Sequence, residues 1–203
     1  LIPIILITLF PTSLIARFQY SGSIHPSGMF HLDDASHISL PFRLAETQLG
    51  YTFANIDLVY SGALEYRWSD SKDARIDSRE FYLAWYPDWG EFRLGRQIIA
   101  WGVVDGNNPT DDVNPYDYYY LFSKGSEQKL GSFSTAGEIY SNSWTFGFSV
   151  SPLHSTNRLP LNDSEFPVEM PASPRASQVL EVENPIEFGG YLSKSFEKGD
   201  LTV

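Results

Sequence analysis

The sequence predicts an all-β protein: an antiparallel up-and-down transmembrane β-barrel, present as an incomplete N-terminal fragment of about eight strands. Two observations lead to this fold class. Aromatic-rich runs alternate apolar and polar residues with a period of two, as strands do. The connections between these runs are short and long in turn. In outer-membrane barrels the short turns face the periplasm and the long loops face outside.

The connections divide into two sets by length. The short ones lie at 54–57, 87–90, 141–143 and 197–200, and the long ones at 69–74, 103–131 and 151–184. Successive antiparallel strands turn back at opposite ends of a sheet, so every short connection falls at one end and every long one at the other. The last long segment is rich in Pro, Ser and Asn, and is expected to be a mobile external loop.

The run 56–68 shows the alternation most clearly. One face carries Ile56, Leu58, Tyr60, Leu64, Tyr66 and Trp68, and the other carries Asp57, Ser61, Glu65 and Arg67. One sheet of a soluble β-sandwich gives the same alternation. Strand length favours the membrane interpretation, because soluble strands usually end after about five or six residues and a tilted membrane strand needs about nine to eleven.

The same period assigns faces along the rest of the chain. The side chains expected to face lipid are Ile56, Leu58, Leu64, Phe81, Leu83, Phe146 and Phe148. Those expected to face the interior are Asp57, Glu65, Arg67 and Glu80.

Two strands carry an irregularity. A first strand over 18–30 contains Pro26, which cannot donate to a ladder, and it is therefore expected at an edge or a bulge. In the strand 91–101, strict alternation puts Arg96 among the apolar residues. We expect a bulge at Gly95 that turns Arg96 inward.

The two ends of the chain differ from its middle. We expect residues 1–16 to be part of a signal peptide and residues 17–203 to be the N-terminal part of the barrel domain. The apolar run 1–10 is too short to span a bilayer as a helix, and Ala16 offers a small residue for signal cleavage. A buried first strand is the alternative for this run. The last run, 200–203, is too short to cross a membrane, so further strands are expected.

The composition restricts the partners and the chemistry. The formal net charge of -11 argues against nucleic acid, because phosphate binding needs clustered Lys and Arg. The chain contains no Cys, which excludes disulfides and thiolate metal sites. Aromatic residues make up 15% of the chain, as expected of a barrel with aromatic girdles at both membrane interfaces.

The segment 91–120 reads EFRLGRQIIAWGVVDGNNPTDDVNPYDYYY. It resembles a family of uncharacterised porin-like outer-membrane proteins of Gram-negative bacteria, whose hallmark is a strand ending in GRQ and WG, then a loop with repeated Asn-Pro and Asp. The matching positions are Gly95, Arg96, Gln97, Trp101, Gly102, Asp105, Asn108, Pro109, Asp111, Asn114, Pro115 and Asp117. The resemblance implies a barrel in the bacterial outer membrane, in contact with lipid and lipopolysaccharide, through which small solutes pass.

The connection 103–131 is a candidate constriction. Its two Asn-Pro steps favour extended or turn geometry and keep it out of the sheet. Folded into a pore, its acids would face bases on the wall and determine which solutes pass. The constriction candidates are Arg93, Arg96, Gln97, Asp105, Asp111, Asp112 and Asp117. The alternative is that the Asp and Asn side chains cap local turns.

Aromatic residues gather in the same stretch. They are Trp101, Tyr116, Tyr118, Tyr119 and Tyr120. Such rings bind sugar faces or apolar chains in an uptake channel, or they anchor a girdle at the membrane interface.

No motif for catalysis stands out. The acidic loop that begins at Asp105 lacks EF-hand spacing, and the nucleophile and nucleotide-binding motifs are absent from the sequence. We therefore expect no enzymatic activity, no cofactor and no metal site. The expected function is an outer-membrane porin-like channel for passive uptake or exchange of small solutes. The alternative is a secreted carbohydrate-binding β-sandwich, with or without calcium.

Overall fold

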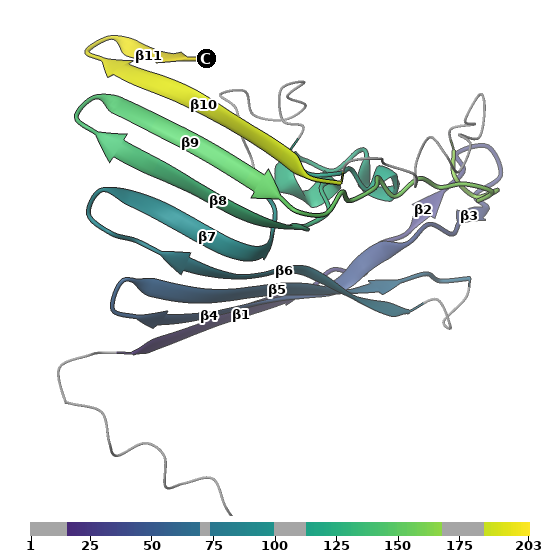
Figure 1. Cartoon of the computed structure of the whole chain (residues 1–203). Coiled ribbons are helices and arrows are strands. Elements are labelled where there is room, and N and C mark those ends of the chain that lie inside the picture. The colour runs from purple at the N-terminus through teal and green to yellow at the C-terminus, as the bar shows by residue number, and fades with distance from the viewer. Residues whose placement is uncertain (1–15, 70–73, 100–112, 168–184) are drawn as a thin grey trace, which may run out of the picture.

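The computed structural model describes residues 16–69, 74–99, 113–167 and 185–203. They form a nine-stranded sheet in which strands that follow each other along the chain also lie side by side (Figure 1). Its strands are β1 (Arg17–Ile24), β4 (Phe42–Phe53), β5 (Ile56–Tyr66), β6 (Arg75–Trp85), β7 (Gly90–Gln97), β8 (Ser132–Ser141), β9 (Trp144–Ser151), β10 (Glu187–Phe196) and β11 (Gly199–Thr202). All neighbouring pairs are antiparallel, which confirms the predicted all-β meander.

Four small elements lie in the long connections. The strands β2 (Met29–Phe30) and β3 (His37–Ile38) pair between β1 and β4. The single 3-10 turns η2 (Tyr118–Tyr120) and η3 (Gly125–Gln128) lie between β7 and β8. Among the residues that the structure describes, no helix is long and apolar enough to cross a membrane.

The two kinds of connection lie at opposite ends of the sheet, as predicted. The hairpins β4–β5, β6–β7, β8–β9 and β10–β11 close at the left in Figure 1, and the longer connections lie at the right. Two of the tight turns hold a residue in the left-handed region, Ala54 with φ 54° and Asn142 with φ 55°. We call the two ends the short-turn end and the long-loop end.

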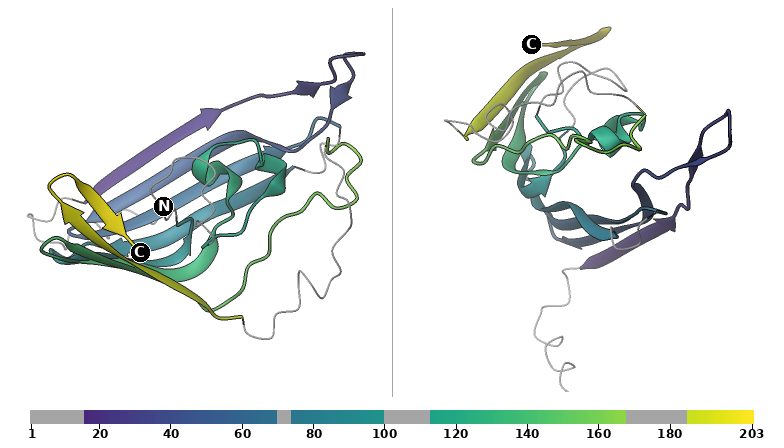
Figure 2. Two further views of the ribbon diagram at one scale, coloured as in Figure 1. Left: turned by 90° about the horizontal axis from the view of Figure 1, so that it is seen from above. Right: turned by 90° about the vertical axis from the view of Figure 1, so that its right-hand side faces the viewer.

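The sheet is curved but not closed. In the described residues β1 pairs only with β4, and β11 pairs only with β10, so the two edges do not meet. Figure 2 shows that the sheet bends around η2 and η3, which lie on its concave side. We call the concave surface the inner face and the convex surface the outer face.

The outer face is apolar and open. One row of paired residues crosses eight strands, and seven of its eight members are apolar or aromatic. The row runs Phe18, Tyr51, Leu58, Leu83, Leu94, Thr135, Val150 and Phe188. Large apolar side chains of this face are more than a third exposed, Leu83 for example at 44%.

The inner face is polar. A row of paired residues on this face contains Arg43, Glu65 and Arg75, and another row of this face holds Gln48, Ser61 and Glu80. The predicted division into two faces is therefore confirmed for β5, β6 and β9.

Aromatic clusters mark both ends of the outer face. At the short-turn end, the rings of Trp85, Trp89 and Phe92 have centroids 5.2–5.9 Å apart. At the long-loop end, Phe42, Tyr66 and Trp68 form a second cluster, with centroids 5.3–6.0 Å apart.

The first strand is shorter than predicted. β1 ends at Ile24, and the expected extension to Phe30 is wrong because Pro26 interrupts the ladder and Phe30 belongs to β2. The predicted edge position of this strand is confirmed.

β4 contains a bulge, which explains why its apolar residues do not keep a single two-residue period along the sequence. The pairing with β5 shifts between Arg43 and Ala45, which leaves Leu44 without a partner. The extra residue exchanges the two faces along β4, so Leu44 falls out of phase with Leu49.

The bulge predicted at Gly95 is wrong. The register of β7 with β6 and β8 is continuous, and it places Arg96 opposite Phe81 and Phe133 on the outer face. Gly95 has φ 138°, and a Cβ there would clash with the carbonyl oxygen of Phe81. Glycine is thus needed for the close approach of β6 and β7, not for a change of register.

Gly147 of β9 is covered by the ring of Tyr191, its partner on β10, whose hydroxyl donates to Glu138. A Cβ at position 147 would clash with that ring. We predict that Gly147→Ala lowers the free energy of unfolding by about 1–3 kcal/mol, because the ring is displaced and its hydrogen bond is lost. Urea unfolding in detergent micelles measures the change.

The matched control is Gly50→Ala, where the nearest atom to a new Cβ lies 3.8 Å away, at an ordinary contact distance. We expect this change to be neutral or slightly stabilising. Equal effects of the two substitutions would contradict the packing of Tyr191 over Gly147.

Candidate functional site

The described part of the connection between β7 and β8, residues 113–131, lies over the inner face, and Asn114 fixes its base. The Asn114 side chain accepts from the Ile99 N–H at 2.6 Å and donates to the carbonyl oxygens of Gln97 and Leu130, at 2.9 and 3.0 Å. It also donates to the Ser132 hydroxyl at 2.9 Å. Asn114, which begins the second Asn-Pro step, thus joins the end of β7 to the start of β8.

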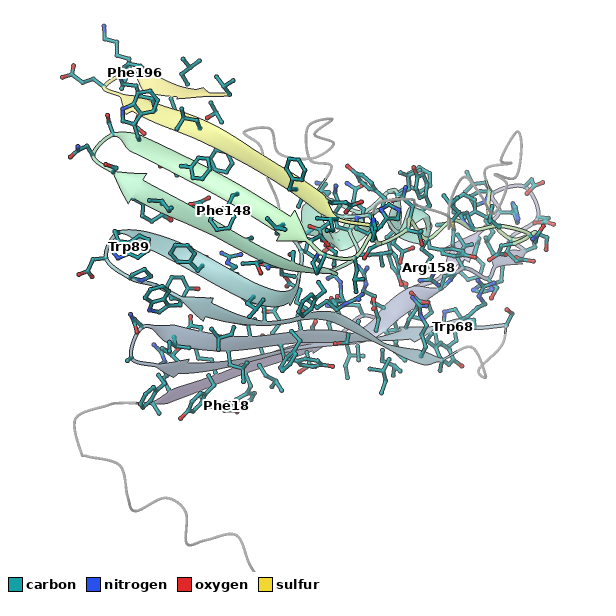
Figure 3. The ribbon with its side chains drawn as sticks, in the orientation of Figure 1. Phe18, Trp68, Trp89, Phe148, Arg158 and Phe196 are labelled. Atoms are coloured by element: carbon teal, nitrogen blue, oxygen red, sulfur yellow. The ribbon has the colours of Figure 1, made fainter. Side chains whose placement is uncertain are left out.

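A carboxylate of the inner wall holds the loops in place. Glu65 of β5 has a side chain only 3% exposed, and it forms a two-pronged ion pair with Arg158, with N–O distances of 2.7 and 2.8 Å. Arg75 of β6 lies 3.0 Å away from the same carboxylate, and the Tyr120 hydroxyl donates to it at 2.9 Å. One buried acid therefore binds the wall strand β6, the β7–β8 loop through Tyr120 and the β9–β10 loop through Arg158. Figure 3 shows Arg158 at the long-loop end of the sheet.

Asp117 is the second acid of this cluster, and it is fully buried. It accepts from the Tyr119 N–H at 3.2 Å, which caps η2, and from Arg158 at 3.1 Å. Burial raises the pKa of Asp117 above its ordinary value, although Arg158 and the Tyr119 N–H act in the opposite direction. Burial opposes the charge of Arg158, yet Glu65 and Asp117 raise the pKa of its guanidinium and keep it ionised.

The two loops also pair through their backbones. The Tyr118 N–H donates to the Arg158 carbonyl at 3.0 Å, and the Arg158 N–H donates to the Tyr116 carbonyl at 2.9 Å. The Tyr116 N–H donates to the Asn157 side chain at 2.7 Å. The segments 116–118 and 157–158 are therefore joined by three hydrogen bonds.

Two arginines of the wall bind the turn η3. Arg43 of β4 donates to the Glu127 carbonyl at 2.9 Å, and its guanidinium lies 3.8 Å from the centre of the Tyr120 ring. Arg79 of β6 donates to the Ser126 carbonyl at 2.7 Å. The loop thus contacts three adjacent strands of the wall, β4, β5 and β6.

The segment 152–167 is not a free external loop, which corrects the prediction for this described part. Asp163 accepts from Arg67 and from the Tyr119 hydroxyl, each at 2.8 Å. Burial disfavours the charged carboxylate, but the hydrogen bonds from Arg67 and Tyr119 outweigh it and lower the pKa of Asp163. This contact is therefore present above pH 3.8, the ordinary pKa of an aspartate, and is lost as the pH falls through the lowered value.

The predicted basic residues do not pair with Asp117, the one acid of that prediction within the described residues. Arg93 lies on the inner face near the short-turn end, in an ion pair with Glu91. Arg96 lies on the outer face, on the other side of the sheet from Asp117. Gln97 is buried on the inner side and donates to the Ser134 carbonyl at 3.0 Å. The partner of Asp117 is Arg158.

The other predicted positions divide into two groups. Trp101, Asp105, Asp111 and Asp112 lie outside the described residues. The tyrosines belong to the described residues. The Lys129 ammonium lies 3.7 Å from the centre of the Tyr116 ring, and the rings of Tyr116 and Tyr118 lie 6.4 Å apart. Tyr119 and Tyr120 bind wall and loop carboxylates, as described above. Burial and the neighbouring Glu65 raise the pKa of Tyr120, so its hydroxyl stays a donor.

Several members of the site were missed by the sequence analysis, among them three that bind partners far along the chain. Arg43, Arg158 and Asp163 gave no local signal, because their partners are distant along the chain; Arg158 and Glu65 are 93 residues apart. The available signal was an inward carboxylate, Glu65, in the middle of a long strand, since such a buried charge requires a cation.

No protein-family model, no curated protein and no solved structure is similar to this chain. In the described ranges, no group of three or more His, Asp or Glu side chains has the arrangement of a metal site.

We predict that Glu65→Gln releases the loop from the wall, because Arg158 and Arg75 lose their shared counter-charge. Lys129, only 3% exposed, then becomes accessible to trypsin. Breaking a buried pair is strongly destabilising, and cleavage follows the open population, so cleavage after Lys129 should accelerate by more than about tenfold. Mass spectrometry of timed digests measures the rate of cleavage after Lys129. Both proteins carry Lys124→Gln, because Lys124 is exposed and trypsin would otherwise cleave there first.

The control for this experiment is Glu91→Gln, which removes a different ion pair of the inner face, with Arg93 near the short-turn end. It should leave cleavage after Lys129 unchanged. Similar rates for the two variants would show that Glu65 does not hold the loop.

Proposed function

We propose that this chain forms part of the wall of an outer-membrane channel for passive uptake or exchange of small solutes. The observation that carries the proposal is the sheet itself, which has an open apolar outer face and a charged inner face with two loops bound to it. Closure into a barrel then requires further strands at the edges of β1 and β11, because a barrel in lipid leaves no unpaired edge.

The dimensions of the outer face support this proposal. Strand β5 has 11 residues, and at about 3.3 Å per residue its ten steps extend about 33 Å. Tilted by about 40°, such a strand spans about 25 Å, the height of an outer-membrane apolar band. The two aromatic clusters lie at the two ends of the outer face, which is where the aromatic girdles of a barrel meet the membrane interfaces.

A soluble β-sandwich is the competing fold. It would need a second sheet to cover the outer face, since an exposed apolar surface of this extent is unfavourable in water. The described residues supply only the pair β2–β3 besides the main sheet. We therefore favour the membrane channel over a secreted carbohydrate-binding module.

Two charged residues depart from the outer pattern, and each has a physical explanation consistent with a membrane. Lys194 lies near the short-turn end, with its ammonium 4.8 Å from the Trp144 ring and 5.1 Å from the Phe196 ring. Arg96 is half-buried, and its stem packs over Gly131, just before β8 at the long-loop end. Long basic side chains of this kind extend toward the interface.

The arrangement of the loops supports a narrowed passage. They occupy the inner side of β4, β5 and β6, and charges from wall and loop alternate there: Arg43, Glu46, Glu65, Arg67, Arg75, Arg79, Asp117, Arg158 and Asp163. Charges that line a narrow aqueous path determine which ions and solutes pass.

Conductance in planar bilayers tests the proposal, measured on a full-length version of the protein that supplies the further strands. Glu46 of β4 lies on the inner face with a side chain 33% exposed. We predict that Glu46→Gln shifts the reversal potential in a salt gradient toward anion preference, because charge in a narrow lumen is poorly screened. Asp34→Asn, in the exposed 31–36 turn, is the control and should leave the potential unchanged. The absence of any channel conductance would contradict the proposal.

A further inference from the structure

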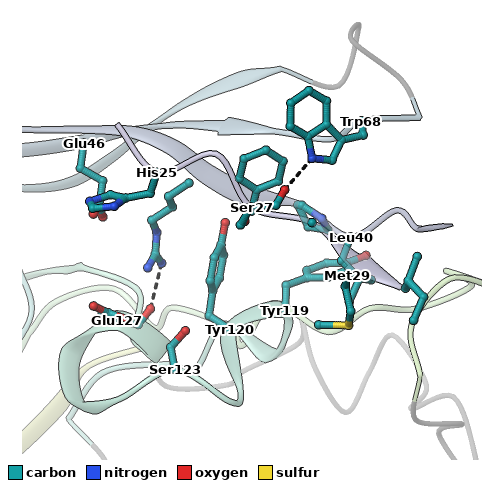
Figure 4. Close-up of a pocket in the computed structure, with 15 residues that line it drawn as sticks. His25, Ser27, Met29, Leu40, Glu46, Trp68, Tyr119, Tyr120, Ser123 and Glu127 are labelled. Atoms are coloured by element: carbon teal, nitrogen blue, oxygen red, sulfur yellow. Dashed lines mark hydrogen bonds between the residues drawn. The ribbon is translucent and has the colours of Figure 1, made fainter. Parts of the chain in front are cut away.

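A cavity of about 420 Å³ lies at the long-loop end, between the wall and the bound loop. The β1–β4 connection and β4 form one side, and the segment 119–127 forms the other (Figure 4). Its lining includes His25, Met29, Phe42, Arg43, Trp68 and Tyr120. The volume is in the range of small-molecule sites.

Arg43 carries an uncompensated charge in this cavity. It is only 8% exposed, and its Nε has no hydrogen-bond partner. In the described residues no carboxylate lies within ion-pair distance of it. Its one hydrogen bond goes to a neutral carbonyl, that of Glu127. A buried cation without a counter-ion is costly, so the site favours an anion.

The nearby acids are already engaged. Glu46, which also lines the cavity, lies 3.8 Å from Arg79. Glu65 is bound by Arg158 and Arg75. The side chain of Glu127 is exposed to solvent, which screens its charge.

The remaining walls are flat and apolar. Phe42 and Trp68, which belong to the aromatic cluster at the long-loop end of the sheet, also line the cavity. Their rings are stacked, with centroids 5.5 Å apart. The indole N–H of Trp68 donates to the Ser27 carbonyl at 2.6 Å, which fixes the orientation of the ring. Tyr120 is held in place by Glu65 and by the guanidinium of Arg43. Such rings suit an aromatic or branched apolar body.

We propose that this cavity binds a small organic monocarboxylate, with its carboxylate on Arg43 and its apolar body against Phe42, Trp68 and Tyr120. A guanidinium binds a carboxylate strongly because the hydrogen bonds are charge-assisted. A neutral sugar would satisfy hydrogen bonds but would leave the charge of Arg43 without a counter-ion. The site does not require a closed barrel, since all the residues named here belong to the described part of the chain.

The test is a binding titration with 3-(4-fluorophenyl)propanoate, followed by fluorine NMR, on the whole chain in non-ionic micelles. The corresponding amide is the neutral probe, and empty micelles correct for partitioning of both. We expect saturable one-to-one binding of the carboxylate, with the amide at least about tenfold weaker, as the loss of a charge-assisted hydrogen bond implies. This comparison needs no variant and therefore does not depend on how a variant folds.

Two arginine variants then locate the site. Arg43→Gln should weaken binding by at least about tenfold. Arg93→Gln is the control, because Arg93 is an inner-face arginine in an ion pair with Glu91 near the short-turn end, and neither residue lines the cavity. It should change the affinity by less than about twofold, within the range of substitutions remote from a site.

Three results would overturn the proposal: equal affinity for the carboxylate and the amide, unchanged binding by Arg43→Gln, or equal losses in both variants. Tighter binding of phenylalanine than of the propanoate would also overturn it, in favour of a zwitterionic ligand held between Arg43 and Glu46. A failure of channel conductance leaves this result unaffected, because binding is measured without a pore.

Discussion

The antiparallel backbone ladder, with its two-residue period, is the constraint on which the whole structure depends. Each strand sends alternate side chains to opposite faces, so a run such as 56–66 must place its acids and its large apolar residues apart. Eight paired strands repeat this separation in register. The result is one sheet with an apolar outer face and a charged inner face.

The inner face imposes the next requirement, because a charge on it must be paired or hydrated. Glu65 is buried and meets this requirement through Arg158, Arg75 and Tyr120. The β7–β8 loop, through Tyr120, and the β9–β10 loop, through Arg158, therefore both bind the carboxylate of Glu65. Arg43 pairs with Glu65 in the same row of the sheet, but no carboxylate among the described residues forms an ion pair with it. Glu65 is therefore a structural anchor, whereas Arg43 is a candidate ligand site.

Local sequence signals predicted the local part of this structure. Periodicity gave the strands, their faces and the alternate short turns, because each depends on neighbours along the chain. It did not give the bulge at Leu44 or the straight register at Gly95, which depend on the adjacent strand. The contacts of Arg158 and Asp163 were also missed, since nothing in residues 152–167 reveals that their partners are Glu65 and Arg67.

The central claim is that the outer face lies in lipid and the inner face lines water. The chain has no Cys, so single cysteines can be placed at each position from 57 to 64 and labelled with an environment-sensitive dye after reconstitution in liposomes. The claim predicts high emission, quenched by lipid-soluble quenchers, at positions 58, 60, 62 and 64, and lower, unquenched emission at 57, 59, 61 and 63. Equal emission along the run, or the opposite phase, would contradict it.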